Sequence, residues 1–428
     1  MNLNSMGVCG FMIQRPRGTR DFLPDEMEKR RFVESKLRVT AKNFGYKEIA
    51  TPTFEHTELF TIKSGPNIVN QMYTFKDKGG RDISLRPELT APALRFYVSE
   101  MKNLPKPLKV YYFGNCFRYE EPQSGRFREF WQFGAESIGS KEAESDAEVI
   151  ALAVYALKNA GLNNFVTRIG HLGILRSILS DVPPDVQSSV MALIDKRDFG
   201  GLKERLSDAK SDAYQLLDEI MNLSGNVIDR AREILKEGRA LESLNQLEEV
   251  LRFLELFGVN DYKVDLGIAR GIDYYVGMVF EIDCPVLGAE KQVCGGGNYE
   301  LAEVFGLESV SSTGFAIGFD RVMIALEREG KEIPSERLKV FVVPASDVMR
   351  KKSLEITTML RKHGIPADVD LMRRGLSKNM KFANAVNAEK VVIVGEDELK
   401  ENSVTLRDMN TGFQERVLID ELVKKLRK

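Results

Sequence analysis

The stretch from Lys109 to Gly139 holds the densest group of residues that could do chemistry. It starts with β-branched and aromatic residues typical of a strand, and it breaks at 121–125, where Pro and Gly favour a turn. It then resumes with alternating large and charged residues, so the pattern predicts a hairpin with a long loop. A strand places every second side chain on one face. The charged residues of this stretch include Arg118, Glu120, Arg126, Arg128 and Glu129.

Such a face suits a polyanion, because arginine forks bind phosphate or carboxylate oxygens in pairs. The neighbouring aromatic rings could stack on a base or on a cation. A solvated hairpin with ordinary cross-strand ion pairs would carry the same residues. The hairpin alone therefore leaves both interpretations open.

Two other places carry residues of chemical interest. Glu88 and Thr90 stand where a predicted strand leads into a helix, and the pair could hold an ammonium group. Thr90 could equally be an ordinary helix cap. Arg321 lies on an otherwise apolar element, Gly314 to Leu326, that is typical of a buried strand entering a helix. Because an unpaired buried charge is costly, Arg321 needs an anionic partner, either a protein carboxylate or a ligand phosphate.

Gly295, Gly296 and Gly297 allow either a close backbone approach to a ligand or a tight turn. A protein-bound metal is not indicated, because the chain has only 3 histidines and its cysteines lack metal-type spacing. The cysteines are expected to be reduced thiols, as in the cytoplasm. They are Cys9, Cys116, Cys284 and Cys294.

The elements around these residues predict an α+β fold. Strands that come as hairpins favour an antiparallel sheet, and a helix from about Pro24 to Phe44 precedes them. Between about 183 and 257 only helical periodicity is found, which predicts a helical insertion into the sheet domain. From 335 to 428 strands and helices alternate, which predicts a separate small α/β domain.

Length and charge agree with this division. A chain of 428 residues is expected to form two or three domains: a sheet domain at 15–334 and the α/β domain at 335–428, after a flexible lead-in at 1–14. From Lys339 to Lys428 there are 18 Lys and Arg against 13 Asp and Glu, a balance of +5, so this part is expected to contact a polyanion. No apolar run approaches the ~20 residues of a membrane span, so no membrane partner is expected.

Taken together, the motifs resemble those of class II aminoacyl-tRNA synthetases, and within that class the histidyl-tRNA synthetase family. The resemblance is carried by Leu85 to Thr90, Phe117 to Arg126, Arg270 to Tyr275, and the element that ends at Arg321. It covers roughly Arg15 to the C-terminus. It implies an antiparallel-sheet catalytic domain with a helical insertion, followed by an α/β anticodon-binding domain.

The resemblance also implies an activity, that of a histidine--tRNA ligase. Such an enzyme activates L-histidine with ATP to histidyl-adenylate and pyrophosphate, and then transfers histidine to the 3′ end of tRNA(His). A cytoplasmic homodimer is implied, and Mg²⁺ is expected to accompany ATP. Because histidine titrates near pH ~6.5, its binding is expected to depend on pH.

The same resemblance assigns residues. Catalytic roles fall to Arg118 and Arg270, and Gln123 would meet the tRNA acceptor end. ATP would be bound by Arg118, Glu120, Arg126, Phe130 and Arg321. Histidine would be held by Glu88, Thr90, Gln132, Glu136, Arg270, Tyr274 and Tyr275.

The sequence departs from the family pattern at two places. Leu89 stands where many relatives have Gly, and Asn298-Tyr299-Glu300 replaces the usual Arg-Tyr-Asp. The second departure weakens any ligand role for Gly295 to Tyr299.

Two alternatives remain. The first is a histidine-binding regulatory paralogue, which typically lacks the C-terminal domain and parts of the motifs, whereas both are present in this chain. The second is another class II synthetase, against which the segment Arg270 to Tyr275 argues.

Overall fold

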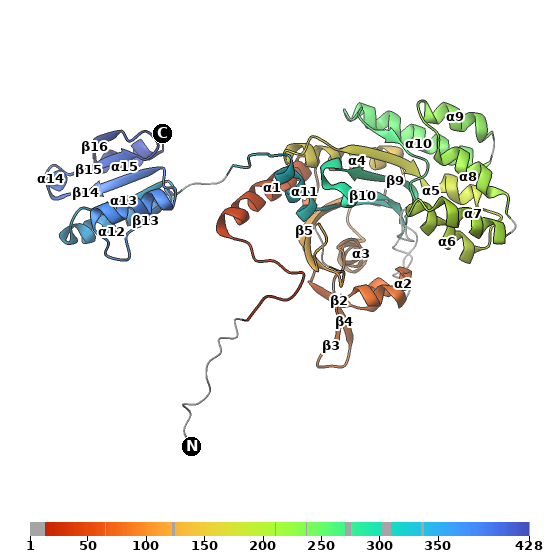
Figure 1. Cartoon of the computed structure of the whole chain (residues 1–428), viewed down its shortest axis with the longest axis horizontal. Helices are drawn as coiled ribbons and strands as arrows, with labels where there is room; N and C mark the ends of the chain where they lie inside the picture. The colour runs from red at the N-terminus through yellow and green to blue at the C-terminus, as the bar shows by residue number, and fades with distance from the viewer. Residues whose placement is uncertain are drawn as a thin grey trace, which may run out of the picture. The chain divides into compact units, whose positions relative to one another are not determined.

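The computed structural model describes residues 13–64, 66–121, 125–209, 211–236, 238–269, 275–300, 310–334 and 338–427 (Figure 1). The chain divides into two compact units, one ending at Ile333 and the other beginning at Pro334. Within the described residues, no helix is long and apolar enough to cross a membrane. The lead-in at 1–12 and three predicted site residues, Gln123, Arg270 and Tyr274, lie outside the described residues.

The first unit is built on an eight-stranded sheet with the order β1-β5-β6-β11-β10-β9-β7-β8. Its outermost pairs, β1 with β5 and β7 with β8, are parallel, and all other neighbours are antiparallel. The predicted α+β class is confirmed. The strands are β1 Lys47–Glu48, β5 Leu108–Phe117, β6 Glu129–Ile138, β7 Val166–His171, β8 Lys263–Val264, β9 Tyr275–Asp283, β10 Gln292–Tyr299 and β11 Ser312–Gly318.

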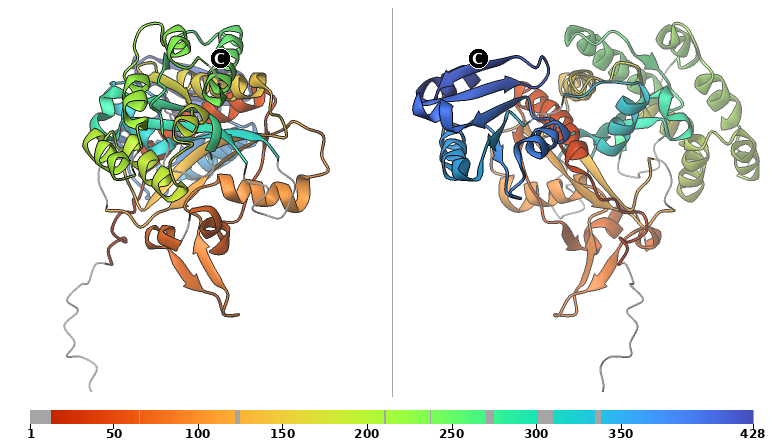
Figure 2. Two further views of the ribbon diagram at one scale, coloured as in Figure 1. Left: turned by 90° about the vertical axis from the view of Figure 1, so that its right-hand side faces the viewer. Right: turned by 60° about the vertical axis from the view of Figure 1, so that its left-hand side comes forward.

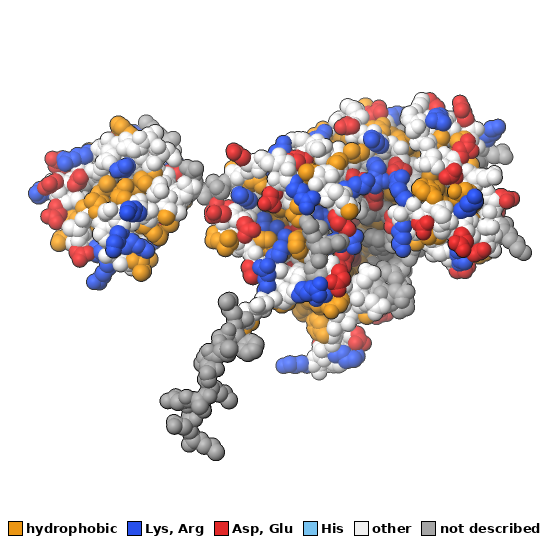
Figure 3. Space-filling view, in the orientation of Figure 1, with side chains coloured by type: hydrophobic (Ala, Val, Ile, Leu, Met, Phe, Trp, Pro, Cys, Tyr) orange, Lys and Arg blue, Asp and Glu red, His pale blue; other side chains and the backbone are white. Residues whose placement is uncertain are grey.

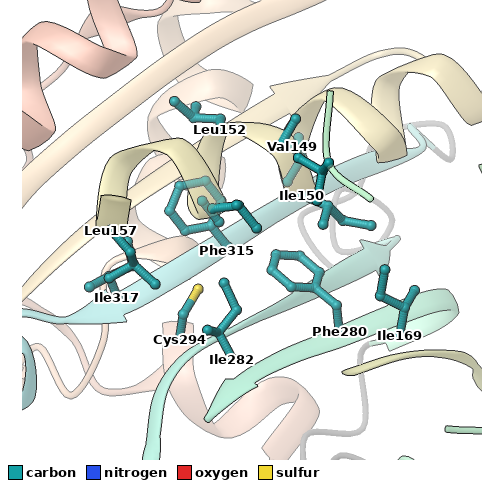
Figure 4. Close-up of a cluster of buried hydrophobic side chains, with 14 of the residues drawn as sticks. Val149, Ile150, Leu152, Leu157, Ile169, Phe280, Ile282, Cys294, Phe315 and Ile317 are labelled. Carbon is teal, nitrogen blue, oxygen red and sulfur yellow. The ribbon is translucent and has the colours of Figure 1, made fainter. Parts of the chain in front are cut away.

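Helices bury one face of this sheet. They are α1 Pro24–Asn43, α4 Ala143–Asn159, α10 Arg239–Leu256 and α11 Phe319–Arg328. Figure 4 shows Val149 and Ile150 of α4 above Phe280 and Phe315 of the sheet. As predicted, α1 begins with Pro24 in its first turn and stops before Gly45, whose φ of +81° suits glycine.

The opposite face of the sheet carries polar residues because side chains alternate along each strand. In β6, Phe133 and Ala135 enter the helix-covered core, whereas Gln132 and Glu136 line a pocket on the other side. Near that face lie α3 Thr90–Phe96, its π-helical continuation Tyr97–Met101, α2 Glu58–Ser64 and the 3-10 turn Pro66–Gln71. A small sheet stands apart from the large one (Figure 2), in the order β2 Phe54–His56, β4 Asp82–Leu85, β3 Thr74–Lys76.

Among the described residues between 184 and 256, all regular elements are helices, as predicted. Leu244, Leu247 and Leu251 of α10 are buried at helical spacing. The outer surface of these helices mixes basic with acidic side chains (Figure 3). With α5 Leu172–Ile178 before them, the other helices are α6 Pro184–Asp195, α7 Phe199–Asp208, α8 Ala213–Met221 and α9 Val227–Ile234.

The second unit is an α/β layer structure around a five-stranded sheet with the order β13-β12-β14-β15-β16. The first three strands are parallel and the last two antiparallel. The strands are β12 Val340–Pro344, β13 Ala367–Val369, β14 Lys390–Val394, β15 Ser403–Asp408 and β16 Gln414–Leu418. The helices are the 3-10 turn Asp347–Met349, α12 Arg350–Lys362, α13 Leu376–Ala385, α14 Glu396–Lys400 and α15 Ile419–Leu426.

The glycine triplet corrects one expectation. The expectation of a tight turn at Gly295 to Gly297 is wrong, because these residues lie inside strand β10, which pairs with β9 and β11. A Cβ on Gly296 would lie 2.3 Å from the carbonyl oxygen of Gly314, and one on Gly297 would lie 2.6 Å from that of Met278. The two glycines therefore let three strands pack closely.

Candidate active site

A pocket lies on the polar face of the large sheet, between the β5–β6 hairpin, β10, β11 and the starts of α3 and α11. It brings together most of the predicted site residues, although the sequence scatters them over more than half of the chain. These are Glu88, Thr90, Arg118, Glu120, Arg126, Phe130, Gln132, Glu136, Tyr275, Gly295 and Arg321. Gly296 and Gly297 are not part of the lining.

One end of the pocket, called here the tyrosine end, is lined by Glu136, Tyr275 and Tyr299, and Tyr112 belongs to it through a hydrogen bond to Glu136. Glu136 is fully buried, and each of its carboxylate oxygens accepts a hydrogen bond of 2.6 Å, Oε1 from the Tyr112 hydroxyl and Oε2 from the Tyr299 hydroxyl. Burial raises the pKa of Glu136 to about 8, although both hydroxyl groups oppose that rise. Burial at the tyrosine end therefore favours the protonated form of the Glu136 carboxyl group.

Two glycines make room for this arrangement. Gly314 is paired with Glu136 across β11 and β6, and a Cβ at Gly314 would lie 1.6 Å from Glu136 Oε2. Gly134 is paired with Tyr112, and a Cβ there would lie 2.4 Å from the Tyr112 ring. Neither distance is compatible with a side chain, so both positions require glycine in this geometry.

Glu88 and Thr90 meet at the start of α3. The Glu88 carboxylate accepts from the backbone N–H groups of Thr90 and Ala91, so Glu88 provides the helix cap that was considered for Thr90. The Thr90 hydroxyl lies 3.3 Å from the Tyr112 hydroxyl. Burial raises the pKa of Glu88 as well. Both side chains belong to the pocket lining beside the tyrosine end.

The other end of the pocket, called here the arginine end, is formed by Arg118, Glu120, Arg126, Phe130 and Arg321. Arg118 Nε donates to the carbonyl oxygen of Pro87 at 3.0 Å, and its guanidinium carbon lies 5.3 Å from the centre of the Phe130 ring. Glu120 Oε1 lies 4.0 Å from Arg118 Nη1, and Glu120 Oε2 lies 3.6 Å from Arg126 Nη1. Three guanidinium groups thus line the pocket together with the half-buried Phe130 ring, a combination that suits a nucleotide.

The structure also identifies the anionic partner of Arg321. Its Nη2 donates to Glu290 Oε2 at 2.9 Å, while Nε and Nη1 donate to the carbonyl oxygens of Gly125 and Gln292 at 3.1 and 2.7 Å. Burial lowers the pKa of Arg321, and the Glu290 carboxylate opposes that effect. Of the two partners that the sequence left open, the protein carboxylate is present.

Sequence reasoning missed Tyr112, Tyr299 and Glu290. For Tyr112 the sequence did contain a signal. The hairpin pairs Tyr112 with Gly134, and Gly134 lies on the same strand face as Glu136, two residues further along the chain. Tyr299 lies in the segment that departs from the family pattern, and the structure places its hydroxyl on the most buried acid of the pocket. Glu290 carried no signal, because nothing in its local pattern distinguishes it from a surface glutamate.

Comparison with known proteins identifies the family of this chain. Residues 18–322 match the family model described as Histidyl-tRNA synthetase, and residues 339–428 match the one described as Anticodon binding domain. A Histidine--tRNA ligase of Methanosarcina acetivorans is 47% identical over 97% of this chain and 98% of its own length. One of Methanocaldococcus jannaschii is 49% identical over 96% of this chain and 99% of its own length.

Solved structures give the same result. The apo histidyl-tRNA synthetase of S. aureus has a TM-score of 0.73 at 32% identity, with 97% of this chain and 100% of that chain covered. A protein of Bacillus halodurans titled as an ATP phosphoribosyltransferase regulatory subunit/histidyl-tRNA synthetase has a TM-score of 0.77 at 27% identity, with 90% and 98% covered.

The antiparallel sheet and its arginine-bearing hairpin define a class II aminoacyl-tRNA synthetase. Members of this class are ATP-dependent ligases. More narrowly, the chain belongs to the histidyl-tRNA synthetase family.

Proposed function

We propose that this chain activates L-histidine with ATP and transfers it to tRNA(His), with the arginine end binding ATP and the tyrosine end binding histidine. The observation that carries the proposal is the division of one pocket between a buried acid network and a cluster of arginines. Family membership and coverage of relatives over nearly their whole length support the same activity.

At the arginine end, the reaction joins a carboxylate to a phosphate. The histidine carboxylate attacks the α-phosphate of ATP, a new acyl oxygen to phosphorus bond forms, and pyrophosphate leaves. Negative charge gathers at the α-phosphate, so positioning and positive charge supply most of the catalysis. Arg118 is proposed to bridge the two reacting groups, with Phe130 stacked on adenine. Arg126 and Arg321 would bind the outer phosphates.

Arg270 is proposed to add a second positive charge at the α-phosphate. Mg²⁺ is proposed to enter as part of the ATP substrate, and it is given no protein ligand here.

At the tyrosine end, an imidazole ring needs an acceptor on one nitrogen and a hydroxyl on the other. Glu136 and Tyr275, with Tyr274 beside them, are proposed to supply these groups. Glu88, Thr90 and Gln132 would hold the α-amino group. An amino acid without ring nitrogens would make none of these hydrogen bonds, and a site built to bond a polar substrate group can discriminate by about 10⁴ against an analogue that lacks it.

The remaining steps involve tRNA and a second subunit. The α/β unit at 338–427, with its net positive charge, is proposed to bind the anticodon, and Gln123 is proposed to meet the acceptor end. A homodimer is proposed on the family resemblance. It is supported by Phe54 and Phe75 of the small sheet, which expose 56% and 47% of their surface. A cytoplasmic location is supported by the buried thiols Cys116 and Cys284, which form no disulfide.

Exchange of labelled pyrophosphate into ATP, tested with each amino acid in turn, measures the first step directly. Histidine alone is expected to support exchange, and labelled histidine is then expected to be charged onto tRNA(His). Exchange without charging would favour the regulatory paralogue. Exchange with another amino acid would favour a different class II synthetase, and no exchange at all would refute the proposal.

A further inference from the structure

Glu290 joins two arginines that come from different parts of the fold. Its Oε2 atom lies 2.9 Å from Arg321 Nη2, on α11, and 2.9 Å from Arg126 Nε, on the β5–β6 hairpin. One carboxylate oxygen therefore bridges two guanidinium groups of the arginine end. Hydrogen bonding to Glu290 is also the main cause that raises the pKa of Arg126.

The loop that carries Glu290 is fastened to the protein independently of any ligand. This loop connects β9 to β10 and is closed by a hydrogen bond of 2.7 Å from Cys284 N to the carbonyl oxygen of Lys291. Leu287 is buried beneath it, and the carbonyl oxygen of Val286 accepts from Arg328. Gly288, with a φ of +73°, reverses the backbone two residues before Glu290.

Glu290 also lies behind the two arginines with respect to the pocket. Arg126 and Arg321 line the pocket, whereas Glu290 does not. The hydrogen bonds of Arg321 to Gly125, Gln292 and Glu290 use three of the five N–H groups that a guanidinium carries. These three bonds leave two N–H groups of Arg321 for a phosphate, so Glu290 does not need to leave when a phosphate binds.

We propose that Glu290 is a positioning residue for ATP: it holds Arg126 and Arg321 together so that both can bind one polyphosphate. The inference rests on the proposed function, in which these two arginines bind the outer phosphates. Without Glu290, the two positive charges repel each other and the hairpin loses a tie to α11. The cost falls on ATP binding, because Arg126 and Arg321, which Glu290 joins, both belong to the arginine end.

The opposite role would be that of a placeholder, a carboxylate that occupies the phosphate site and competes with ATP. The two roles predict opposite changes in the KM for ATP when Glu290 is removed. Loss of a positioning carboxylate raises the KM for ATP, whereas loss of a competing carboxylate lowers it.

The test is pyrophosphate exchange by the full-length protein, with KM measured separately for ATP and histidine. Glu290→Gln keeps the shape of the side chain and removes its charge, and Glu290→Ala removes both. Both variants are expected to raise the KM for ATP by about 10-fold or more, with the KM for histidine within about 2-fold of wild type. Glu248→Gln, which breaks an ion pair of 2.6 Å with Arg232 in the helical insertion, is the matched control and should change neither value.

An unchanged or lowered KM for ATP in Glu290→Gln would overturn the positioning role. A parallel rise of both KM values would overturn it as well, because it would indicate a general loss of structure. If the wild-type protein itself shows no histidine-dependent exchange, the proposed function fails and not merely the role of Glu290.

Discussion

The two ends of the pocket hold their carboxylates in different ways. At the tyrosine end, Glu136 is fully buried and held by two tyrosine hydroxyls, and its pKa is raised to about 8. At the arginine end, Glu120 and Glu290 retain 24% of their side-chain surface and are held by arginines. Burial raises the pKa of Glu136 although its two tyrosine donors oppose that rise, whereas Glu120 and Glu290 lie beside arginine guanidinium groups. The two ends of the pocket therefore offer different surroundings, one buried with neutral donors and the other rich in positive charge.

Arg118→Ala breaks the arginine end and is expected to have the largest effect. It removes the group proposed to bridge the histidine carboxylate and the α-phosphate, so pyrophosphate exchange should fall by about 10³-fold or more. The fold should survive, because the Arg118 side chain is 36% exposed. Thermal unfolding within a few degrees of wild type would confirm that the loss is chemical. Retained exchange would show that the role of the hairpin is wrong.

Gly314→Ala breaks the tyrosine end alone. Its Cβ would fall 1.6 Å from Glu136 Oε2, so the acid must move out of its two hydrogen bonds. The KM for histidine is expected to rise by about 100-fold, which corresponds to about 2.7 kcal/mol, with little change in the KM for ATP. Gly375→Ala controls for a glycine substitution as such, because no atom lies within 4 Å of a Cβ at that site and its backbone φ is −71°. Equal rises in both KM values would contradict the separation of the two ends.

Glu136→Gln tests the protonation state of the tyrosine end through stability. The pKa of Glu136 is raised in the folded protein to about 8, against ~4.3 in the unfolded chain, so the folded state holds the extra proton between these values. Wild-type stability should therefore fall relative to the variant as pH rises from about 5 to 8, by at most about 1.4 kcal/mol per pH unit. Urea unfolding of both proteins across this range gives the difference, and a constant difference would contradict the raised pKa.

Tyr299→Phe is the smallest of these changes and tests a single hydrogen bond of the tyrosine end. It deletes one hydroxyl that donates to the buried Glu136 and keeps the ring, so the KM for histidine should rise by about 5- to 10-fold, or about 1 kcal/mol. Tyr155→Phe removes a hydroxyl that bonds only the exposed carbonyl oxygen of Phe257, and it serves as control. No difference between the two variants would mean that Tyr299 does not support the acid.

Local patterns predicted the elements and the polar face, because hairpins, helix stops and strand alternation depend on neighbouring residues. The convergence of Glu88, Arg118 and Arg321 in one pocket followed from the family resemblance and is seen in the structure. The residues that hydrogen-bond to these site residues could not be predicted in the same way. Tyr299 and Glu290 reach Glu136 and Arg321 across strand pairings and loop closures that no local pattern encodes. The tight turn expected at the glycine triplet was wrong for the same reason, since only the neighbouring strands show why side chains are excluded at these positions.

The paired glycines Gly134 and Gly314 also bear on the engineering of this enzyme toward histidine analogues. A designer who needs a roomier site gains nothing at these two positions, because they have no side chain left to remove. Space gained by shortening Tyr112 or Tyr299 deprives Glu136 of a donor. A wider substrate range is therefore tied to the working pH of the variant, and a library that varies these tyrosines should be screened at several pH values.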